Sequence, residues 1–203
     1  LLAVKPQQFR EVVREFGNLV REDHLVVSIM AGVSTASIEN SLPHIKARVV
    51  RTMPNLAAHV GAGMAGVCPG RYASEADLLR AQRIFDASGK SVHIADESLM
   101  DAVTAVSGTG PAYYYFFTEA LMEAAKRVGL SPQYANLLAK QTALGAARMM
   151  LESGEPPDVL RAKVTSPGGT TAAALTSMRD NQIFEHIVAG VVAAFNRSRE
   201  LGA

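Results

Sequence analysis

Residues 166–171 read SPGGTT, and their types and spacing suit the binding of a small anion. Pro167 favours the start of a helix, whose first peptide N–H groups have no partner within the helix. Gly168 and Gly169 carry no side chain, so a ligand can approach these donors closely. The positive end of the helix dipole adds attraction for a carboxylate or a phosphate. The alternative is a tight turn between two helices that needs glycine only for packing.

A stretch of similar composition, SGTGPAY, occupies residues 107–113 and predicts a second helix start of small residues before a proline. Just upstream, Glu97 and Asp101 stand four residues apart, which is one turn of a helix. Two carboxylates at this spacing can orient a cationic ligand or take part in general acid chemistry. The alternative is that both form part of a solvated face.

The elements that must position these residues fall into two halves of different texture. Up to about residue 95, short β-type runs alternate with helical patterns, which predicts βαβ units and a mostly parallel sheet. The predicted strands are Leu1–Val4, Leu25–Met30, Val49–Met53, Met64–Cys68 and Ser91–Ala95. The predicted helices are Pro6–Phe16, Thr35–Leu42 and Glu75–Ser88, the last with Ser74 as its N-cap. Because a strand opens the chain, we expect the N-terminal part of this domain to lie upstream of Leu1.

Parallel sheets bind ligands beyond the carboxyl ends of their strands. Two turns occupy such positions and are the predicted cofactor contacts. They consist of Ala3, Val4, Lys5 and Pro6, and of Met30, Ala31 and Gly32. Residues 61–66 also match the letters GxGxxG, but Pro69 and Gly70 follow where a dinucleotide site needs a helix. That stretch is therefore predicted to be a loop that leads into a strand.

From about residue 97 onwards, helices replace strands. Ser131 and Pro132 predict one helix start. A later helix is predicted by a single apolar stripe of Phe184, Ile187, Val188, Val191, Val192 and Phe195. The run Ala112–Met122 is apolar almost all round, so it must be buried on every side. We expect a partner chain to complete that burial; the alternative is a central position in a monomeric bundle.

The composition is that of a globular protein, with 48% hydrophobic and 19% charged residues. The net charge of +1, with acids and bases interspersed, argues against nucleic-acid binding, and the apolar runs are too short to cross a membrane. Cys68 is the single cysteine, so no internal disulfide can form, which favours a cytoplasmic location. The histidines lack the spacing of metal ligands, so no metal site is expected.

Taken together, these motifs resemble those of the pyrroline-5-carboxylate reductase family. The matching stretches are AVKP (3–6), MAG (30–32), RTMPN (51–55), DAVTAVSGTGPAYYY (101–115), LGAARM (144–149) and SPGGTTAAAL (166–175). They follow the family's order and cover nearly the whole chain. The resemblance implies an α/β fold followed by an all-α fold. Residues 1–96 would be the C-terminal portion of a Rossmann-like dinucleotide-binding domain, and residues 97–203 a helical dimerisation and substrate-binding domain.

The resemblance also implies an activity: reduction of 1-pyrroline-5-carboxylate to L-proline by hydride transfer from NADPH or NADH, the last step of proline biosynthesis. It assigns the small-molecule substrate to Glu97, Ser166, Gly168, Gly169, Thr170 and Thr171. The Thr171 hydroxyl would bond the ring nitrogen and act as the catalytic group. The cofactor is assigned to the two turns named above and to Asn55. Homodimers with interlocked helical domains would assemble further, commonly into decamers, and each site would combine two chains.

The sequence departs from the family pattern in places. The first strand, the GxGxxG turn and the second strand of the nucleotide domain are absent, and Thr109 replaces a serine. Two other functions fit parts of the chain: a Rossmann-type dehydrogenase of hydroxy or keto acids, and an oligomerisation module without activity. Such dehydrogenases usually need a catalytic lysine or histidine. Lys126, Lys140 and Lys163 exist, but none lies in the two glycine-rich stretches.

Overall fold

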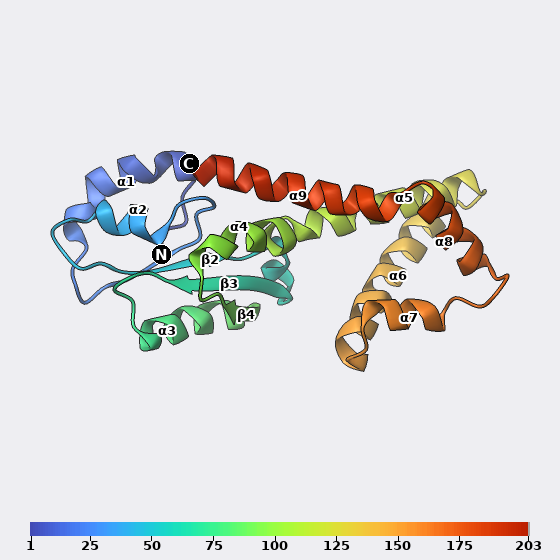
Figure 1. The fold of residues 1–203 in the computed structure, drawn as a ribbon, viewed down its shortest axis with the longest axis horizontal. Coiled ribbons are helices and arrows are strands. Elements are labelled where there is room, and N and C mark those ends of the chain that lie inside the picture. Colours follow the sequence, from blue (N-terminus) through green and yellow to red (C-terminus); the bar gives the residue numbers. More distant parts are fainter. Residues whose placement is uncertain (203) are drawn as a thin grey trace. The chain divides into compact units, whose positions relative to one another are not determined.

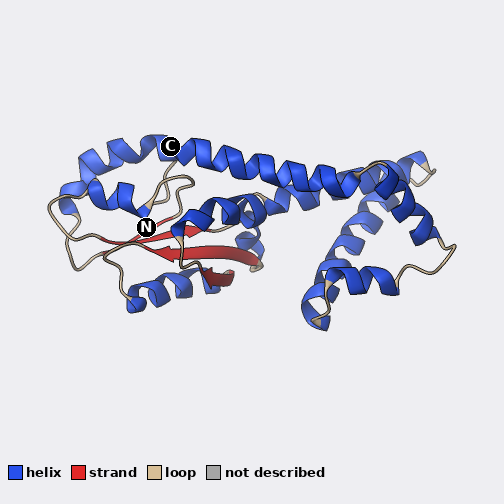
Figure 2. Cartoon of the chain, in the orientation of Figure 1, coloured by secondary structure: helices blue, strands red, loops and turns tan. Residues whose placement is uncertain are grey.

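The computed structural model describes residues 1–202; Ala203, the end of the predicted helical domain, lies outside them. The chain divides into two compact units (Figures 1 and 2). One unit holds residues 1–111 and the chain from Val191 onwards, and the other holds residues 112–190. We call them the α/β unit and the helical unit. These units follow spatial contacts, and the predicted domain boundary between residues 96 and 97 stays a prediction.

The α/β unit is built on a four-stranded sheet in the order β1-β2-β3-β4. The strands are β1 (Leu25–Ser28), β2 (Arg48–Met53), β3 (Gly63–Pro69) and β4 (Gly89–His93). The outer pairs β1–β2 and β3–β4 are parallel, as expected, but the central pair β2–β3 is antiparallel. In the stretch that matches GxGxxG, residues 61 and 62 lead into β3, as predicted, but the strand begins at Gly63, so residues 63–66 are strand and not loop.

The connections explain the strand directions. A parallel pair needs a long crossover, and α2 (Thr35–Asn40) and α3 (Glu75–Asp86) supply one for each outer pair. Between β2 and β3 the chain has only residues 54–62, which hold the short 3₁₀ helix η3 (Leu56–Val60). So short a connection returns the chain antiparallel.

The predicted first strand is reduced to a single bridge. Leu2 pairs in parallel with Ser28, and its N–H donates to the Val27 carbonyl at 2.7 Å. The predicted helix from Pro6 to Phe16 forms as a 3₁₀ turn, η1 (Pro6–Gln8), followed by α1 (Phe9–Phe16).

Alternation along the parallel strands builds two cores. Val26 pairs with Val49 and Val27 with Val50, and successive side chains point to opposite faces of the sheet. One face packs under α1 and α2, with the buried cluster Phe9, Val26, Met30, Ile38, Leu42, Ala47 and Val49. The other packs against α3, with Val27, Val50, Ala65, Val67, Leu78 and Ala81.

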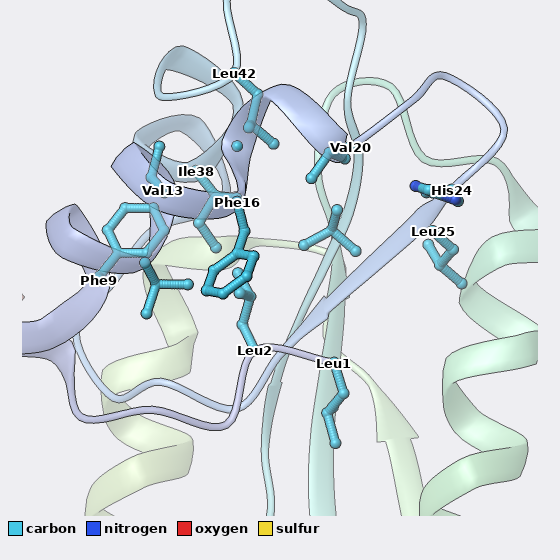
Figure 3. Close-up of a pocket in the computed structure, with 13 residues that line it drawn as sticks. Leu1, Leu2, Phe9, Val13, Phe16, Val20, His24, Leu25, Ile38 and Leu42 are labelled. Carbon is cyan, nitrogen blue, oxygen red and sulfur yellow. The ribbon is translucent and has the colours of Figure 1, made fainter.

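An apolar cavity of about 220 Å³ lies beside α1 in the α/β unit (Figure 3). Side chains of Phe9, Val13 and Phe16 line one side, and Leu1, Leu2 and Leu25 lie across from them. His24 is the one titratable side chain among its lining residues. The cavity therefore offers hydrophobic contact but no group of residues for acid–base chemistry.

A continuous helical stretch follows the sheet, and it corrects one prediction. The short elements η4 (Glu97–Leu99), α4 (Met100–Val103) and the π-turn η5 (Thr104–Gly108) lead into α5 (Gly110–Arg127). SGTGP is therefore not a helix start, because the Thr109 N–H already bonds the Thr104 carbonyl at 2.8 Å. Pro111 has no N–H to donate to the Ser107 carbonyl four residues earlier. The side-chain amide of Asn55 donates to that carbonyl instead.

The helical unit contains most of α5, then α6 (Pro132–Ser153), α7 (Pro157–Lys163), α8 (Thr170–Asp180) and the first part of α9 (Ile183–Gly202). Ser131 caps α6 as predicted, since its hydroxyl accepts the Tyr134 N–H at 3.3 Å. In this single chain the aromatic face of α5 is open: Tyr114 is 66% exposed and Phe116 is 75% exposed. The alternative, that α5 lies at the centre of a monomeric bundle, is therefore wrong.

Candidate functional site

The helix after SPGG begins later than the proline suggests. Gly169 is the N-cap of α8 and Thr170 is its first residue. Pro167 and Gly168 form a turn before it, closed by a bond from the Gly169 N–H to the Ser166 carbonyl at 3.0 Å. The prediction that Pro167 opens the helix is wrong, and the Gly169 N–H is already used within the turn.

Three peptide donors remain at this helix start. The first bond inside α8 joins the Ala173 N–H to the Gly169 carbonyl at 3.1 Å. The N–H groups of Thr170, Thr171 and Ala172 have no helical acceptor, as expected for a first turn. The predicted donor set ran from Gly168 to Thr171. In the structure Thr170 and Thr171 are free donors, Ala172 joins them, and the Gly169 N–H is used within the turn.

The N-caps of four helices show why these donors stay free. In α2, α3 and α6 a serine hydroxyl accepts the third N–H of the helix. In α8 the cap is Gly169, which has no side chain to do this, and the first turn holds no acidic residue. The start of α8 therefore presents uncapped donors and a positive dipole end without a negative charge from its own first turn.

Both glycines of the turn have a steric reason. Gly168 has φ +71°, a conformation that side chains other than glycine rarely adopt. A Cβ on Gly169 would lie 2.5 Å from the Ser166 hydroxyl. Thr170 is exposed and Thr171 half-buried, and neither hydroxyl makes a hydrogen bond within residues 1–202. The arrangement can bind a small carboxylate through backbone donors, with two hydroxyls beside it.

The predicted cofactor turns gather at one edge of the sheet in the α/β unit. Leu2, β1 and β2 run in parallel, so their carboxyl ends share an edge. The structure brings Lys5, the turn 30–32 and Asn55 to the ends of these three segments. Lys5 and Ala3 are exposed, whereas Val4, Pro6, Ala31 and Gly32 are half-buried and Met30 is buried.

Two of these residues are also held by the protein itself. Asn55 donates to the Ser107 carbonyl at 3.1 Å and accepts from the Met64 N–H at 3.2 Å. A Cβ on Gly32 would meet the Gly202 backbone nitrogen at 3.1 Å, and Gly32 has φ +74°. The fold itself therefore explains why residue 32 is glycine and residue 55 is asparagine. Contact with the cofactor stays a prediction for both residues.

The residues at this edge fit a dinucleotide cofactor in kind. Gly32, Ser34, Arg51 and Arg199 line an open cavity of about 320 Å³ together with Glu97, Ser98 and Asp101. Nearby, the Ser107 hydroxyl is buried and has no hydrogen-bond partner among residues 1–202, although its carbonyl is bonded by Asn55. A polar cavity and an unpaired donor at the carboxyl ends of parallel strands match what a nucleotide needs.

Glu97 does not lie on a solvated face, and neither does Asp101. Arg51, in the middle of β2, forms ion pairs with both, at 3.2 Å and 3.8 Å. Sequence reasoning missed Arg51 as a partner. The available signal was a charged residue inside the apolar strand Val49–Met53, because a buried charge must be paired.

Other groups in the chain offer less chemistry. Cys68 is 1% exposed, and burial, followed by the negative charge of Glu97, raises the pKa of its thiol to about 11. Over residues 1–202 the acidic, histidine and cysteine side chains form no cluster suited to a metal ion. The same residues include no helix that is long and apolar enough to span a membrane.

Comparison with known families finds one match. Residues 97–201 match the family described as "Pyrroline-5-carboxylate reductase dimerisation". The pyrroline-5-carboxylate reductase of Methanosarcina acetivorans is 43% identical over 202 residues, which are 100% of this chain and 74% of that protein. The enzyme of the same name from Pseudomonas aeruginosa is 40% identical, over 99% of this chain and 73% of that protein.

Solved structures agree with the sequence comparison. A pyrroline-5-carboxylate reductase from Coxiella burnetii superposes with a TM-score of 0.92 at 39% identity, covering 100% of this chain and 75% of that one. A pyrroline carboxylate reductase from Plasmodium falciparum with NADP bound gives a TM-score of 0.90 at 32% identity. That match covers 99% of this chain and 80% of the other.

Proposed function

This chain belongs to the pyrroline-5-carboxylate reductase family, and on that premise we propose how its residues carry out the family's reaction. The protein reduces 1-pyrroline-5-carboxylate to L-proline with NAD(P)H, which is the last step of proline biosynthesis. The observation that supports the assignment of the site is the uncapped start of α8, with three free peptide donors behind a glycine turn.

The substrate is a five-membered cyclic imine that bears a carboxylate. We assign the carboxylate to the backbone N–H groups of Thr170, Thr171 and Ala172. Each hydrogen bond to such a charged group contributes about 1.5–3 kcal/mol. Ser166, Gly168 and Gly169 form the turn that lets the ring approach. The Thr171 hydroxyl then bonds the ring nitrogen and fixes which face of the imine is presented for reaction.

The bound nicotinamide supplies the hydride chemistry, in which the imine carbon receives a hydride and the carbon–nitrogen double bond becomes single. The ring nitrogen ends as the protonated amine of proline, so a neutral imine takes up two protons with the hydride and an already protonated imine takes up one. The protein's part is to bind and orient the imine, and the Thr171 hydroxyl stays within hydrogen-bond reach of the nitrogen as its charge changes.

The cofactor is assigned to the carboxyl edge of the sheet. Its predicted contacts are Ala3, Val4, Lys5, Pro6, Met30, Ala31, Gly32 and Asn55. Support comes from the shared edge of three parallel segments and from the polar cavity beside Gly32 and Ser34. The Ser107 hydroxyl is buried close to Asn55 and has no hydrogen-bond partner among residues 1–202.

The protein works as a homo-oligomer. We propose that the helical domains of two chains interlock, that dimers assemble further into decamers, and that each site combines the sheet edge of one chain with α8 of another. Exposed aromatic residues on α5 support a partner chain. We also propose the domain division 1–96 and 97–203, and a cytoplasmic location supported by the lone Cys68.

The direct test is an assay of NADPH and NADH oxidation with 1-pyrroline-5-carboxylate, run beside open-chain 2-keto acids. The proposed function predicts turnover of the cyclic imine alone. Turnover of keto acids without turnover of the imine would instead support a hydroxy-acid dehydrogenase. Assembly without any turnover would support an oligomerisation module.

A further inference from the structure

The strongest group of contacts outside α8 centres on Arg51 in the α/β unit. Its side chain is 7% exposed, in the middle of β2 between residues that build the core. Arg51 Nη1 lies 3.2 Å from Glu97 Oε1, and Nη2 lies 3.8 Å from Asp101 Oδ1. Asp101 Oδ1 also accepts the Ser198 hydroxyl at 2.7 Å. A buried guanidinium is thus neutralised by two carboxylates of this chain.

Both oxygens of Glu97 are engaged by the protein itself. Glu97 Oε1 accepts the Thr35 N–H at 2.8 Å in addition to Arg51. Glu97 Oε2 accepts the Thr35 hydroxyl at 2.5 Å. These three charge-assisted bonds use three of the about four acceptor positions of the carboxylate, which leaves one, on Oε2, for any other donor.

The two partners of Glu97 lie close in sequence to two of the predicted cofactor contacts, the turn at residues 30–32 and Asn55. Thr35 is the first residue of α2 and closely follows the turn at residues 30–32. Arg51 comes shortly before Asn55 at the end of β2. Glu97 therefore links the segment that follows the turn at residues 30–32 to the part of β2 that leads to Asn55. Both segments lie at the edge where the cofactor is assigned.

We propose that Glu97 is a positioning residue that fixes the spacing between the turn at residues 30–32 and Asn55, rather than a substrate contact. This inference rests on the proposed function, because it takes the sheet edge as the cofactor site. The Glu97 carboxylate acts through its bonds to Thr35 and Arg51. These bonds hold the backbone at residues 30–32 and near Asn55 in place before the nucleotide binds.

Kinetic and binding measurements on variants separate the two roles. Glu97→Gln keeps the shape but loses the charge that pairs with Arg51. Thr35→Val keeps the shape but loses the hydroxyl that bonds Glu97. We expect the Kd of NADPH, measured by fluorescence titration, to rise about tenfold in Glu97→Gln and less in Thr35→Val. The KM for 1-pyrroline-5-carboxylate at saturating NADPH should stay within about twofold of the unaltered protein.

A double variant tests whether the residues act as one unit. If Thr35 and Glu97 act through their shared contact, Glu97→Gln with Thr35→Val should bind NADPH about as weakly as Glu97→Gln alone. Glu75→Gln is the matched control, because Glu75 is an exposed acid in the same unit and should leave both constants unchanged. A raised KM for the imine with unchanged NADPH affinity would overturn the proposal and make Glu97 a substrate contact.

Amide hydrogen exchange supplies a measurement that needs no cofactor. In Glu97→Gln, exchange should speed up in residues 30–35 and 53–55, while α3 exchanges as before. Unchanged amide exchange in residues 30–35 and 53–55 would overturn the proposal. Failure of the unaltered protein to bind NADPH would contradict the proposed function instead, so the two failures are distinguishable.

Discussion

The two units of this chain differ in how far they bury their apolar side chains. In the α/β unit the sheet is covered by helices, and the β2 valines Val49 and Val50 are 0% exposed. In the helical unit, Ala135 and Ala139 are the only buried hydrophobic residues among those described, whereas Tyr114 and Phe116 are mostly exposed. The first unit buries a core of its own, and the second has apolar faces that a partner must cover.

Their polar groups differ in the same sense. Around Arg51 the α/β unit pairs its charges internally, so that network holds its shape without a ligand. At the start of α8 the helical unit leaves peptide donors unpaired. One region therefore supplies a rigid support, and the other supplies bonding groups that a ligand completes.

The largest effect should come from a charge on the open face of α5. In Phe116→Asp an unpaired carboxylate would be buried at the interface, which costs about 4 kcal/mol and weakens association about a thousandfold. Light scattering and analytical ultracentrifugation should show monomers, with activity lost. The control is Ile84→Asp, a half-exposed apolar residue on α3, which should leave the assembly intact. Intact oligomers in Phe116→Asp would break the contrast between the units.

The next effect concerns the Thr171 hydroxyl at the start of α8. Thr171→Ala removes the proposed bond to the ring nitrogen and should lower kcat/KM for the imine about tenfold to a hundredfold. Oligomer size should not change. Thr176→Ala, an exposed threonine on the same helix, serves as the control and should keep unaltered kinetics. Equal kinetics in the two variants would remove Thr171 from the site.

A smaller effect tests the internal pairing of the α/β unit. Burial raises the pKa of Asp77, but hydrogen bonds from Ser74 and the charge of Arg48 outweigh it and hold that pKa below its ordinary value. The stabilisation is therefore present above about pH 4 and is lost as the pH falls through the folded-state value. Asp77→Asn should lower the free energy of unfolding by about 2 kcal/mol at neutral pH, with the difference shrinking in acid.

Urea unfolding at neutral and acid pH measures this difference. Glu75→Gln, in the first turn of the same helix but exposed, should change the free energy of unfolding by only a few tenths of a kcal/mol. If Asp77→Asn lowered the free energy of unfolding equally at every pH, the charge of Asp77 would make no contribution to stability.

The smallest effect concerns Cys68. Because burial raises the pKa of its thiol to about 11, the group stays protonated near pH 8 and reacts slowly. Mass spectrometry after iodoacetamide treatment should find the folded protein unmodified and the denatured protein fully alkylated. Rapid alkylation of the folded protein would mean that the core around Cys68 opens readily.

Local patterns in the sequence predicted much of this molecule. The cap at Ser74, the helix start at Ser131 and Pro132, and the later strands needed only neighbouring residues, and the structure confirms them. The predicted strand Leu1–Val4 is the exception, because only Leu2 forms a bridge. The antiparallel β3 was also within reach, because residues 54–62 are too few for a parallel crossover.

What the sequence did not reveal depends on distant contacts. The π-turn at residues 104–108 places the Ser107 carbonyl beside Asn55, which is 52 residues away in the chain. Glu97 meets Arg51 across 46 residues and Thr35 across 62. The exact start of α8 depends on a backbone bond inside the turn, which residue types alone do not determine.

A crystal structure of the protein with L-proline bound tests the central claim most directly. The account predicts the proline carboxylate within hydrogen-bond distance of the peptide nitrogens of Thr170, Thr171 and Ala172, with the ring nitrogen beside the Thr171 hydroxyl. Proline bound elsewhere, with the turn at Gly168 and Gly169 closed by protein side chains, would contradict it.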